Sequence, residues 1–257
     1  MQQDLRMAVL IDADNVPRNC ISDIMQELAV YGTPTIKRIY GDWTNVAMSS
    51  WKAELLKNAF TPMQQYGYTT GKNSTDSAMI IDAMDILYAG AVEAFCIVSS
   101  DSDFTRLALR LREAGKKVYG VGENKTPEPF RVACDKFIYV EVLNAQRDEQ
   151  TRKPRQKPAA PPAQQPPQPP AAAPPPLPSQ ILVLISNTIE DVCDDDGWAY
   201  LGEVGSLLQK KKPDFDPRSY GYKKLTLLVG ANDNFEMDAR ENTQRSSGKQ
   251  IYVRNRR

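Results

Sequence analysis

The feature that most constrains the fold is a proline-rich segment that divides the chain. Twelve of the nineteen prolines lie between Pro154 and Pro178, among alanines and glutamines. Proline fixes φ and has no backbone N–H, so this stretch favours an extended polyproline II spacer of ~3.1 Å per residue and builds no core. We therefore expect a larger domain at residues 1–147, a flexible linker at 148–179 and a smaller domain at 180–257.

Before the linker, short apolar runs alternate with longer amphipathic segments. This alternation predicts an α/β domain, a sandwich with a mostly parallel sheet and helices on both faces. The expected strands are 7–11, 35–40, 62–66, 94–99, 118–121 and 137–142, and the expected helices are 16–30, 48–60, 75–88, 103–114 and 129–134.

After the linker, the pattern changes to helices followed by strands. Helices are expected near 181–193, 201–210 and 219–228, and strands near 235–239 and 250–253. Three helices followed by a β-hairpin predict a small winged helix-turn-helix domain.

Composition narrows the chemistry. The chain has no histidine, which excludes a Ser-His-Asp triad and any His-ligated metal site. Thirty-two basic and thirty-two acidic side chains cancel, so nucleic-acid binding would have to be local. The four cysteines lack CxxC spacing and are expected to be reduced core thiols, and no apolar run reaches the ~18 residues of a membrane span. We therefore expect a cytoplasmic protein without a membrane partner.

Acidic residues follow two of the expected strands. Asp12 and Asp14 come directly after the first strand, Asp101 and Asp103 after the fourth, and Asp76 opens the helix between them. If the first and fourth strands are neighbours, these carboxylates meet at one edge of the sheet, where ligands bind in such folds. Oxygen ligands without histidine or thiolate favour Mg²⁺ or Mn²⁺, which can activate a water for phosphodiester hydrolysis.

Helix capping is the competing explanation for several of these residues. Asp14 with Asn15, Asp76 and Asp103 all stand where a helix is expected to begin, and each could serve as an N-cap. Capping does not account for Asp12 and Asp101. Asp82 lies about 600° around the helix from Asp76 at ~100° per residue, so it is expected on a solvated face or, at best, in an outer shell of the site.

The runs VLIDADN, GKNSTD and IVSSDSDF resemble the NYN branch of the PIN-like nucleases, over about residues 5–143. The resemblance implies a PIN-like α/β/α sandwich with an acidic Mg²⁺ or Mn²⁺ site for RNA hydrolysis. It also implies the roles of single residues. Asp12 would be the first-strand acid, Asp76 the central acid, and Asp101 with Asp103 the last pair; Asn15 and Asp14 would support them, and Lys72 would contact phosphate. Ser100 stands where this family pattern often has glycine.

The run GWAYLGEVGSLLQKKKPDFDPRSYGYKKLTLLV, with the terminal QIYVR, resembles a LOTUS (OST-HTH) domain, over about residues 179–254. This resemblance implies RNA or protein binding without catalysis. Twelve basic residues against six acids after residue 208 indicate a basic face for phosphate contact and base stacking. The candidates are Lys210, Lys211, Lys212, Arg218, Tyr220, Tyr222, Lys223 and Lys224. The alternative is a solvated helix end with two core tyrosines.

Together these patterns predict a metal-dependent ribonuclease that hydrolyses RNA through Asp12, Asp76, Asp101 and Asp103 and binds single-stranded or structured RNA through its C-terminal domain. Two alternatives stay open. One is an RNA-binding adaptor with a degenerate nuclease fold, and the other is a phosphatase with Asp12 as nucleophile. Homo-oligomers also stay open, since no residue pattern points to an interface.

Overall fold

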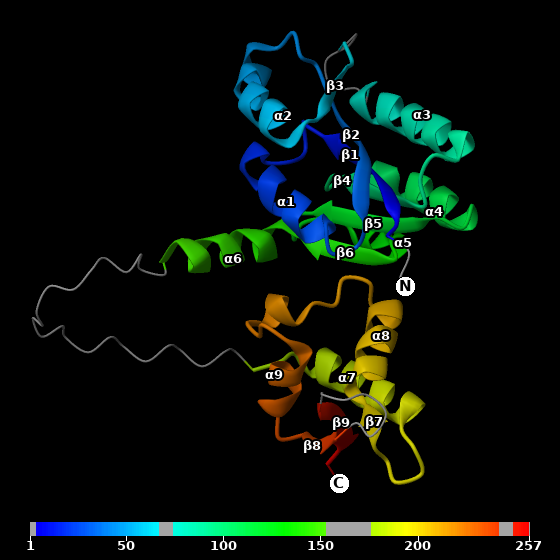
Figure 1. Cartoon of the computed structure of the whole chain (residues 1–257), viewed down its shortest axis with the longest axis vertical. Coiled ribbons are helices and arrows are strands. Elements are labelled where there is room, and N and C mark those ends of the chain that lie inside the picture. Colours follow the sequence, from blue (N-terminus) through cyan, green and yellow to red (C-terminus); the bar gives the residue numbers. More distant parts are fainter. Residues whose placement is uncertain (1–3, 67–73, 153–175, 242–248, 257) are drawn as a thin grey trace, which may run out of the picture. The chain divides into compact units, whose positions relative to one another are not determined.

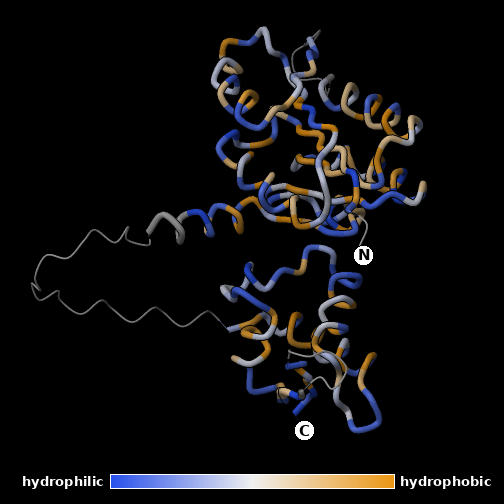
Figure 2. Tube along the Cα trace, viewed as in Figure 1, coloured by the Kyte–Doolittle hydropathy of each residue, from blue (hydrophilic) through white to orange (hydrophobic). Residues whose placement is uncertain are grey.

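A computed structural model describes residues 4–66, 74–152, 176–241 and 249–256, which fall into two compact units (Figure 1). The first unit comprises residues 1–147 and the second most of residues 148–257. Hydrophobic residues concentrate inside each unit (Figure 2). No helix in the described ranges has the length and apolar character needed to cross a membrane.

The first unit is built on a six-stranded parallel sheet in the order β3-β2-β1-β4-β5-β6. Its strands are β1 (Arg6–Asp12), β2 (Thr33–Gly41), β3 (Thr61–Gln64), β4 (Ala94–Val98), β5 (Lys117–Gly122) and β6 (Lys136–Tyr139). β1 and β4 pair directly, as the sequence analysis assumed. The α/β sandwich with a parallel sheet is thereby confirmed.

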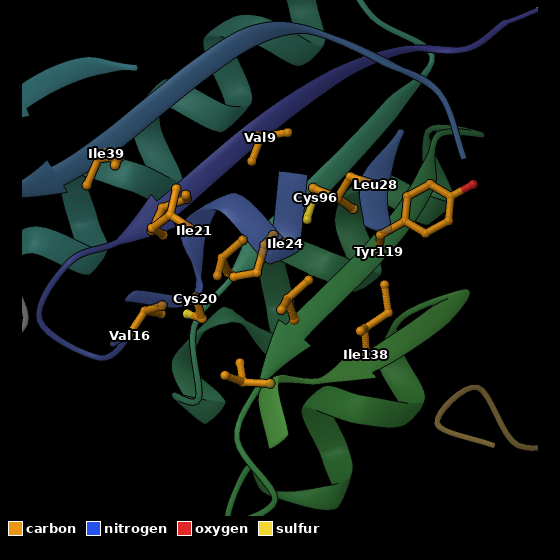
Figure 3. Packing of buried hydrophobic residues seen from close by; sticks show 14 of the residues in the cluster. Val9, Val16, Cys20, Ile21, Ile24, Leu28, Ile39, Cys96, Tyr119 and Ile138 are labelled. Carbon is orange, nitrogen blue, oxygen red and sulfur yellow. The ribbon is translucent and has the colours of Figure 1, made fainter. Parts of the chain in front are cut away.

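Two cores lie on opposite faces of this sheet, because strand residues alternate between faces. Val9 and Ile11 pack on one face with Ile24 of the first helix (Figure 3). Ala8 and Leu10 pack on the other face with residues of the third and fourth helices. Burial on both faces explains why the central strands read as continuous apolar runs.

The helices α1 to α5 lie between successive strands of the sheet, and α6 follows the last strand. They are α1 (Ile21–Leu28), α2 (Lys52–Asn58), α3 (Ser74–Ala89), α4 (Thr105–Glu113), α5 (Glu128–Ala133) and α6 (Val140–Arg152), with 3₁₀ turns η1 (Arg18–Cys20), η2 (Val46–Trp51) and η3 (Ser102–Phe104). The helices expected at 16–30 and 48–60 thus begin with 3₁₀ turns.

The strand expected at 137–142 is wrong beyond Tyr139. The chain turns into α6 at Val140, and Val140 and Leu143 are buried against the sheet at helical spacing. The same helix extends to Arg152, so the first residues of the expected linker are helical.

The strands of this parallel sheet end at a carboxyl edge and begin at an amino edge, and these two edges differ. The carboxyl ends of β1 and β4 lead into Asp12 and Asp101, whereas the opposite edge carries tight turns at Gly90 and Gly115. Both glycines have positive φ, 65° and 76°, a region that other residues enter only with strain. No atom beyond their own chain neighbours approaches either position within 4 Å.

Over residues 176–241 and 249–256, the second unit contains three α-helices and a small antiparallel sheet of order β7-β9-β8. The elements are α7 (Ser179–Val192), β7 (Ala199–Tyr200), α8 (Leu201–Lys211), η4 (Pro217–Tyr220), α9 (Leu225–Gly230), β8 (Phe235–Glu241) and β9 (Lys249–Asn255). This arrangement of helices and hairpin agrees with the expected winged helix. The helix expected at 219–228 is wrong as a single element, because Gly221 adopts φ 83° and separates η4 from α9.

Candidate functional site

The neighbouring strands β1 and β4 deliver acidic side chains to one edge of the sheet. Asp76 reaches the same place from the first turn of α3. One carboxylate oxygen from each of Asp76, Asp101 and Asp103 lies within 4.8 Å of the other two. Residues separated by 27 positions in the sequence thus form one cluster, which is called the acid cluster below.

Asp12 lies beside the acid cluster and is fully buried. Its Oδ1 accepts from the Asp14 backbone N–H (3.1 Å), and its Oδ2 accepts from Asn15 Nδ2 (2.6 Å) and Ser99 Oγ (3.0 Å). Burial raises the pKa of Asp12, and the hydrogen bonds from Asn15 and Ser99 oppose that rise. Asp12 therefore holds the start of the β1 loop and the end of β4 together.

Ser99 connects the acidic segments, and the sequence analysis missed it. Its hydroxyl donates to Asp12 and accepts from the Asp101 backbone N–H at 3.1 Å. Asp101 in turn accepts from the Asp103 N–H at 2.9 Å and caps η3. The expectation that capping does not account for Asp101 was therefore wrong. The serine that opens the S-x-D-S-D run, Ser99, was the signal that could have found this bridge.

Asp14, Asn15 and Asp103 do not occupy the N-cap positions of the helical turns that follow them. The N-cap of η1 is Pro17 and that of α4 is Phe104, and neither makes a side-chain cap bond. Asn15 donates to Asp12, and Asp14 accepts from the Thr75 hydroxyl at 3.1 Å. Asp14 and Asn15 therefore contact residues of the acidic segments and of the start of α3.

Asp76 carries the clearest electrostatic signature of the site. Its side chain is 7% exposed, and burial raises its pKa from 3.8 to about 6, with further increases from the charges of Asp12, Asp101, Asp103 and Asp14. Carboxylates held this close repel one another, and a divalent cation relieves that repulsion. An all-carboxylate donor set fits a hard cation such as Mg²⁺ or Mn²⁺.

Asp82 lies elsewhere, and the expectation of a solvated face was wrong. It forms an ion pair with Arg38 and accepts a hydrogen bond from the Tyr40 hydroxyl. Its side chain is 17% exposed and that of Arg38 is 30% exposed, while Tyr40 is buried. Asp82 therefore joins α3 to β2. Lys72, the expected phosphate contact, lies outside the described residues.

The eight residues expected to bind RNA in the second unit have different surroundings. Three cations have carboxylate partners: Lys211 pairs with Asp191, Lys212 with Asp214 at 2.8 Å, and Arg218 with Asp216 at 2.6 Å. Tyr220 and Tyr222 pack against the core, as the alternative held, and Tyr220 lies beside Phe215. Lys210, Lys223 and Lys224 are exposed.

Comparison with protein families identifies both units. The NYN domain profile matches residues 6–141, more than half of the chain. The chain belongs to the NYN domain family. The OST-HTH/LOTUS profile matches residues 174–247, so the second unit is a LOTUS domain. NYN domains form part of the PIN-like nuclease superfamily, and LOTUS domains are associated with RNA binding.

Three solved structures are similar to parts of this NYN protein. A protein of unknown function from Vibrio parahaemolyticus is 19% identical, and the match covers 54% of this chain and 94% of that one, with a TM-score of 0.47. An uncharacterized protein from Nitrosomonas europaea is 39% identical over 38% of this chain and 92% of that one, with a TM-score of 0.29. A protein from Chromobacterium violaceum is 33% identical over 30% of this chain and 79% of that one, with a TM-score of 0.25. No curated protein matches the chain.

Proposed function

We propose that this protein is a ribonuclease that hydrolyses RNA phosphodiester bonds at the acid cluster with Mg²⁺ or Mn²⁺, while its LOTUS domain binds the RNA. One observation carries the proposal: carboxylates of Asp76, Asp101 and Asp103 converge within 4.8 Å at the carboxyl edge of a parallel sheet. The cytoplasmic location belongs to the same proposal, because all four cysteines are free thiols.

The chain's own residues have distinct tasks in this proposal. Asp76, Asp101 and Asp103 each offer an oxygen to the cation. Asp12 contributes its negative charge. Its Oδ1 accepts one hydrogen bond, from the Asp14 N–H, and keeps a lone pair for a fourth contact with the cation. Asn15 and Ser99 fix the orientation of Asp12. A bound Mg²⁺ or Mn²⁺ would lower the pKa of a water and stabilise charge on the phosphodiester.

The phosphatase alternative fits the geometry poorly. An aspartate nucleophile must reach its substrate, but Asp12 is fully buried and both of its oxygens accept hydrogen bonds. The adaptor alternative predicts RNA binding without cleavage, so a cleavage assay separates it from the ribonuclease.

The test is cleavage of labelled single-stranded RNA by wild type and by Asp101→Asn, each with Mn²⁺, with Mg²⁺ and with EDTA. We expect wild type to cut only with a metal, and the variant to be slower by about 100-fold or more, because removal of one anionic ligand weakens the cation site. Wild type that binds RNA and never cuts with either metal would establish the adaptor instead.

Replacing Ser99 with alanine should lower cleavage by about tenfold and leave the fold intact. The substitution removes the hydroxyl that joins Asp12 to the Asp101 loop, while every carboxylate remains. The measurement is the Mn²⁺ concentration for half-maximal cleavage, which should rise in Ser99→Ala. Ser102→Ala, an exposed serine of the same loop, is the matched control. Equal metal dependence of the two variants would refute a positioning role for Ser99.

A further inference from the structure

The LOTUS domain carries a sheet face that the sequence analysis did not use. In β9, Ile251 and Val253 face the core, so Tyr252 and Arg254 between and after them face outward. Tyr252 pairs with Tyr200 of β7 on one side and with Asp238 of β8 on the other. Large side chains from all three strands therefore share the outer face of this sheet.

These side chains form a continuous series of rings and guanidinium groups. The series is called the ladder below and consists of Tyr200, Tyr252, Arg240, Trp198 and Arg254. The Arg254 guanidinium lies 4.6 Å from the Trp198 ring centroid, and the Arg240 guanidinium lies 5.2 Å from the same centroid. Arg240 also lies 4.5 Å from the Tyr252 ring, whose centroid is 5.9 Å from that of Tyr200. Cations and aromatic faces at these distances attract one another.

Carboxylates fix the two arginines of the ladder in place. Asp238 accepts from Arg240 Nε at 2.9 Å, and Glu236 accepts from Arg254 Nε at 2.8 Å. The side chains of both arginines are about 40% exposed, and Tyr200 is 38% exposed. Planar groups are thus held at the surface with little rotational freedom left to lose on binding.

We propose that the ladder is a stacking surface for the bases of single-stranded RNA. The exposed Tyr200 ring and the guanidinium planes of Arg240 and Arg254 match the flat faces of bases. A proline-rich peptide fits less well, because it needs open grooves between rings, and here guanidinium groups occupy that space. This inference rests on the proposed RNA-binding function and names the surface that performs it.

The charges predict how binding responds to salt. Glu236 and Asp238 balance Arg240 and Arg254, so base stacking supplies most of the affinity. If two phosphates are contacted, raising NaCl from 50 to 200 mM should weaken binding only about sevenfold, at a slope of about −0.7 per phosphate. Additional contacts by Lys210, Lys223 and Lys224 would weaken it by more than about 100-fold.

The test measures binding of the full chain to fluorescein-labelled single-stranded RNA in EDTA, by fluorescence anisotropy. Tyr200→Ala and Arg240→Lys should each raise Kd by at least about fivefold, the loss expected for one stacked base. Arg240→Lys keeps the positive charge and removes the guanidinium plane together with its Nε donor to Asp238. Tyr88→Ala, an exposed tyrosine of the NYN domain, should leave Kd unchanged within about twofold. Circular dichroism verifies the fold of each variant.

Each outcome separates this inference from the nuclease proposal. If wild type and the two ladder variants bind RNA with equal affinity, the ladder proposal is overturned, even if wild type cleaves RNA with Mn²⁺. Wild type that shows no RNA binding in EDTA overturns it as well. Loss of binding in both variants supports the ladder, whether or not the NYN domain cleaves.

Discussion

Asp76→Asn should stabilise the metal-free protein and strongly lower its metal-dependent cleavage. Burial and neighbouring carboxylates raise the pKa of Asp76 to about 6 in the folded protein, above its ordinary value of 3.8. The folded state therefore binds the Asp76 proton more tightly than the unfolded chain, and ionised Asp76 destabilises the fold above about pH 6. Because asparagine resembles the protonated acid, we expect a gain of roughly 1–2 kcal/mol at pH 7.5, after allowance for screening.

The measurement is urea unfolding of both proteins in EDTA at several pH values. The advantage of Asp76→Asn should be full near pH 7.5, shrink as pH falls through 6, and vanish below about pH 4, where Asp76 is protonated in both states. Excess Mn²⁺ should raise the unfolding midpoint of wild type more than that of the variant. Cleavage should fall by roughly 10²- to 10⁴-fold. A variant less stable than wild type in EDTA at pH 7.5 would contradict the repulsion on which the metal site is argued.

Asp82→Ala should have the opposite effect on stability. Asp82 lies six residues further along α3 and holds the Arg38 guanidinium and the buried Tyr40 hydroxyl. Its removal leaves a half-buried cation and a buried hydroxyl without this acceptor, which costs about 2–4 kcal/mol. Burial raises the pKa of Tyr40 above its ordinary value of 10.0, so in the variant the hydroxyl stays protonated at pH 7.5 and keeps needing an acceptor.

Urea unfolding at pH 7.5 measures this loss, and a double-mutant cycle assigns it. Tyr40→Phe in the Asp82→Ala background should recover about 1 kcal/mol, because it removes the buried hydroxyl that lost its partner. The Mn²⁺ dependence of cleavage should match wild type, since Asp82 lies outside the acid cluster. If Asp82→Ala were as stable as wild type, the ion pair with Arg38 would contribute nothing to the free energy of unfolding. If the variant lost the Mn²⁺ dependence of cleavage, Asp82 would belong to the metal site.

The sequence predicted the elements that depend on local pattern. β1 and β4 are buried on both faces, and their uninterrupted apolar runs identify them without knowledge of any neighbour. The acids that follow these strands were found for the same reason. Errors arose where one apolar pattern suits two structures. The run after Phe137 serves β6 and then α6, because Ile138 of β6 and Val140 and Leu143 of α6 are buried in the same core.

Contacts between distant residues could not be read from the chain. Asp82 and Arg38 are 44 positions apart, so periodicity along α3 shows the direction of Asp82 and not its partner. The expected basic face had the same weakness, because Asp191, which pairs with Lys211, lies 20 positions earlier in α7. The ladder was within reach, since strict alternation through Ile251, Tyr252 and Val253 marks an aromatic that faces outward.

The glycine turns at the amino edge of the NYN sheet have a practical consequence. A Cβ added at Gly90 or Gly115 would meet open space. The strands β4 and β5, which follow these turns, separate them from the acid cluster. A short peptide inserted after Gly115 would project from the side opposite the acids, where loop tips tolerate insertion. The protein could be tethered to a bead or a glass surface through such a handle and watched, one molecule at a time, with its acidic edge open to solvent.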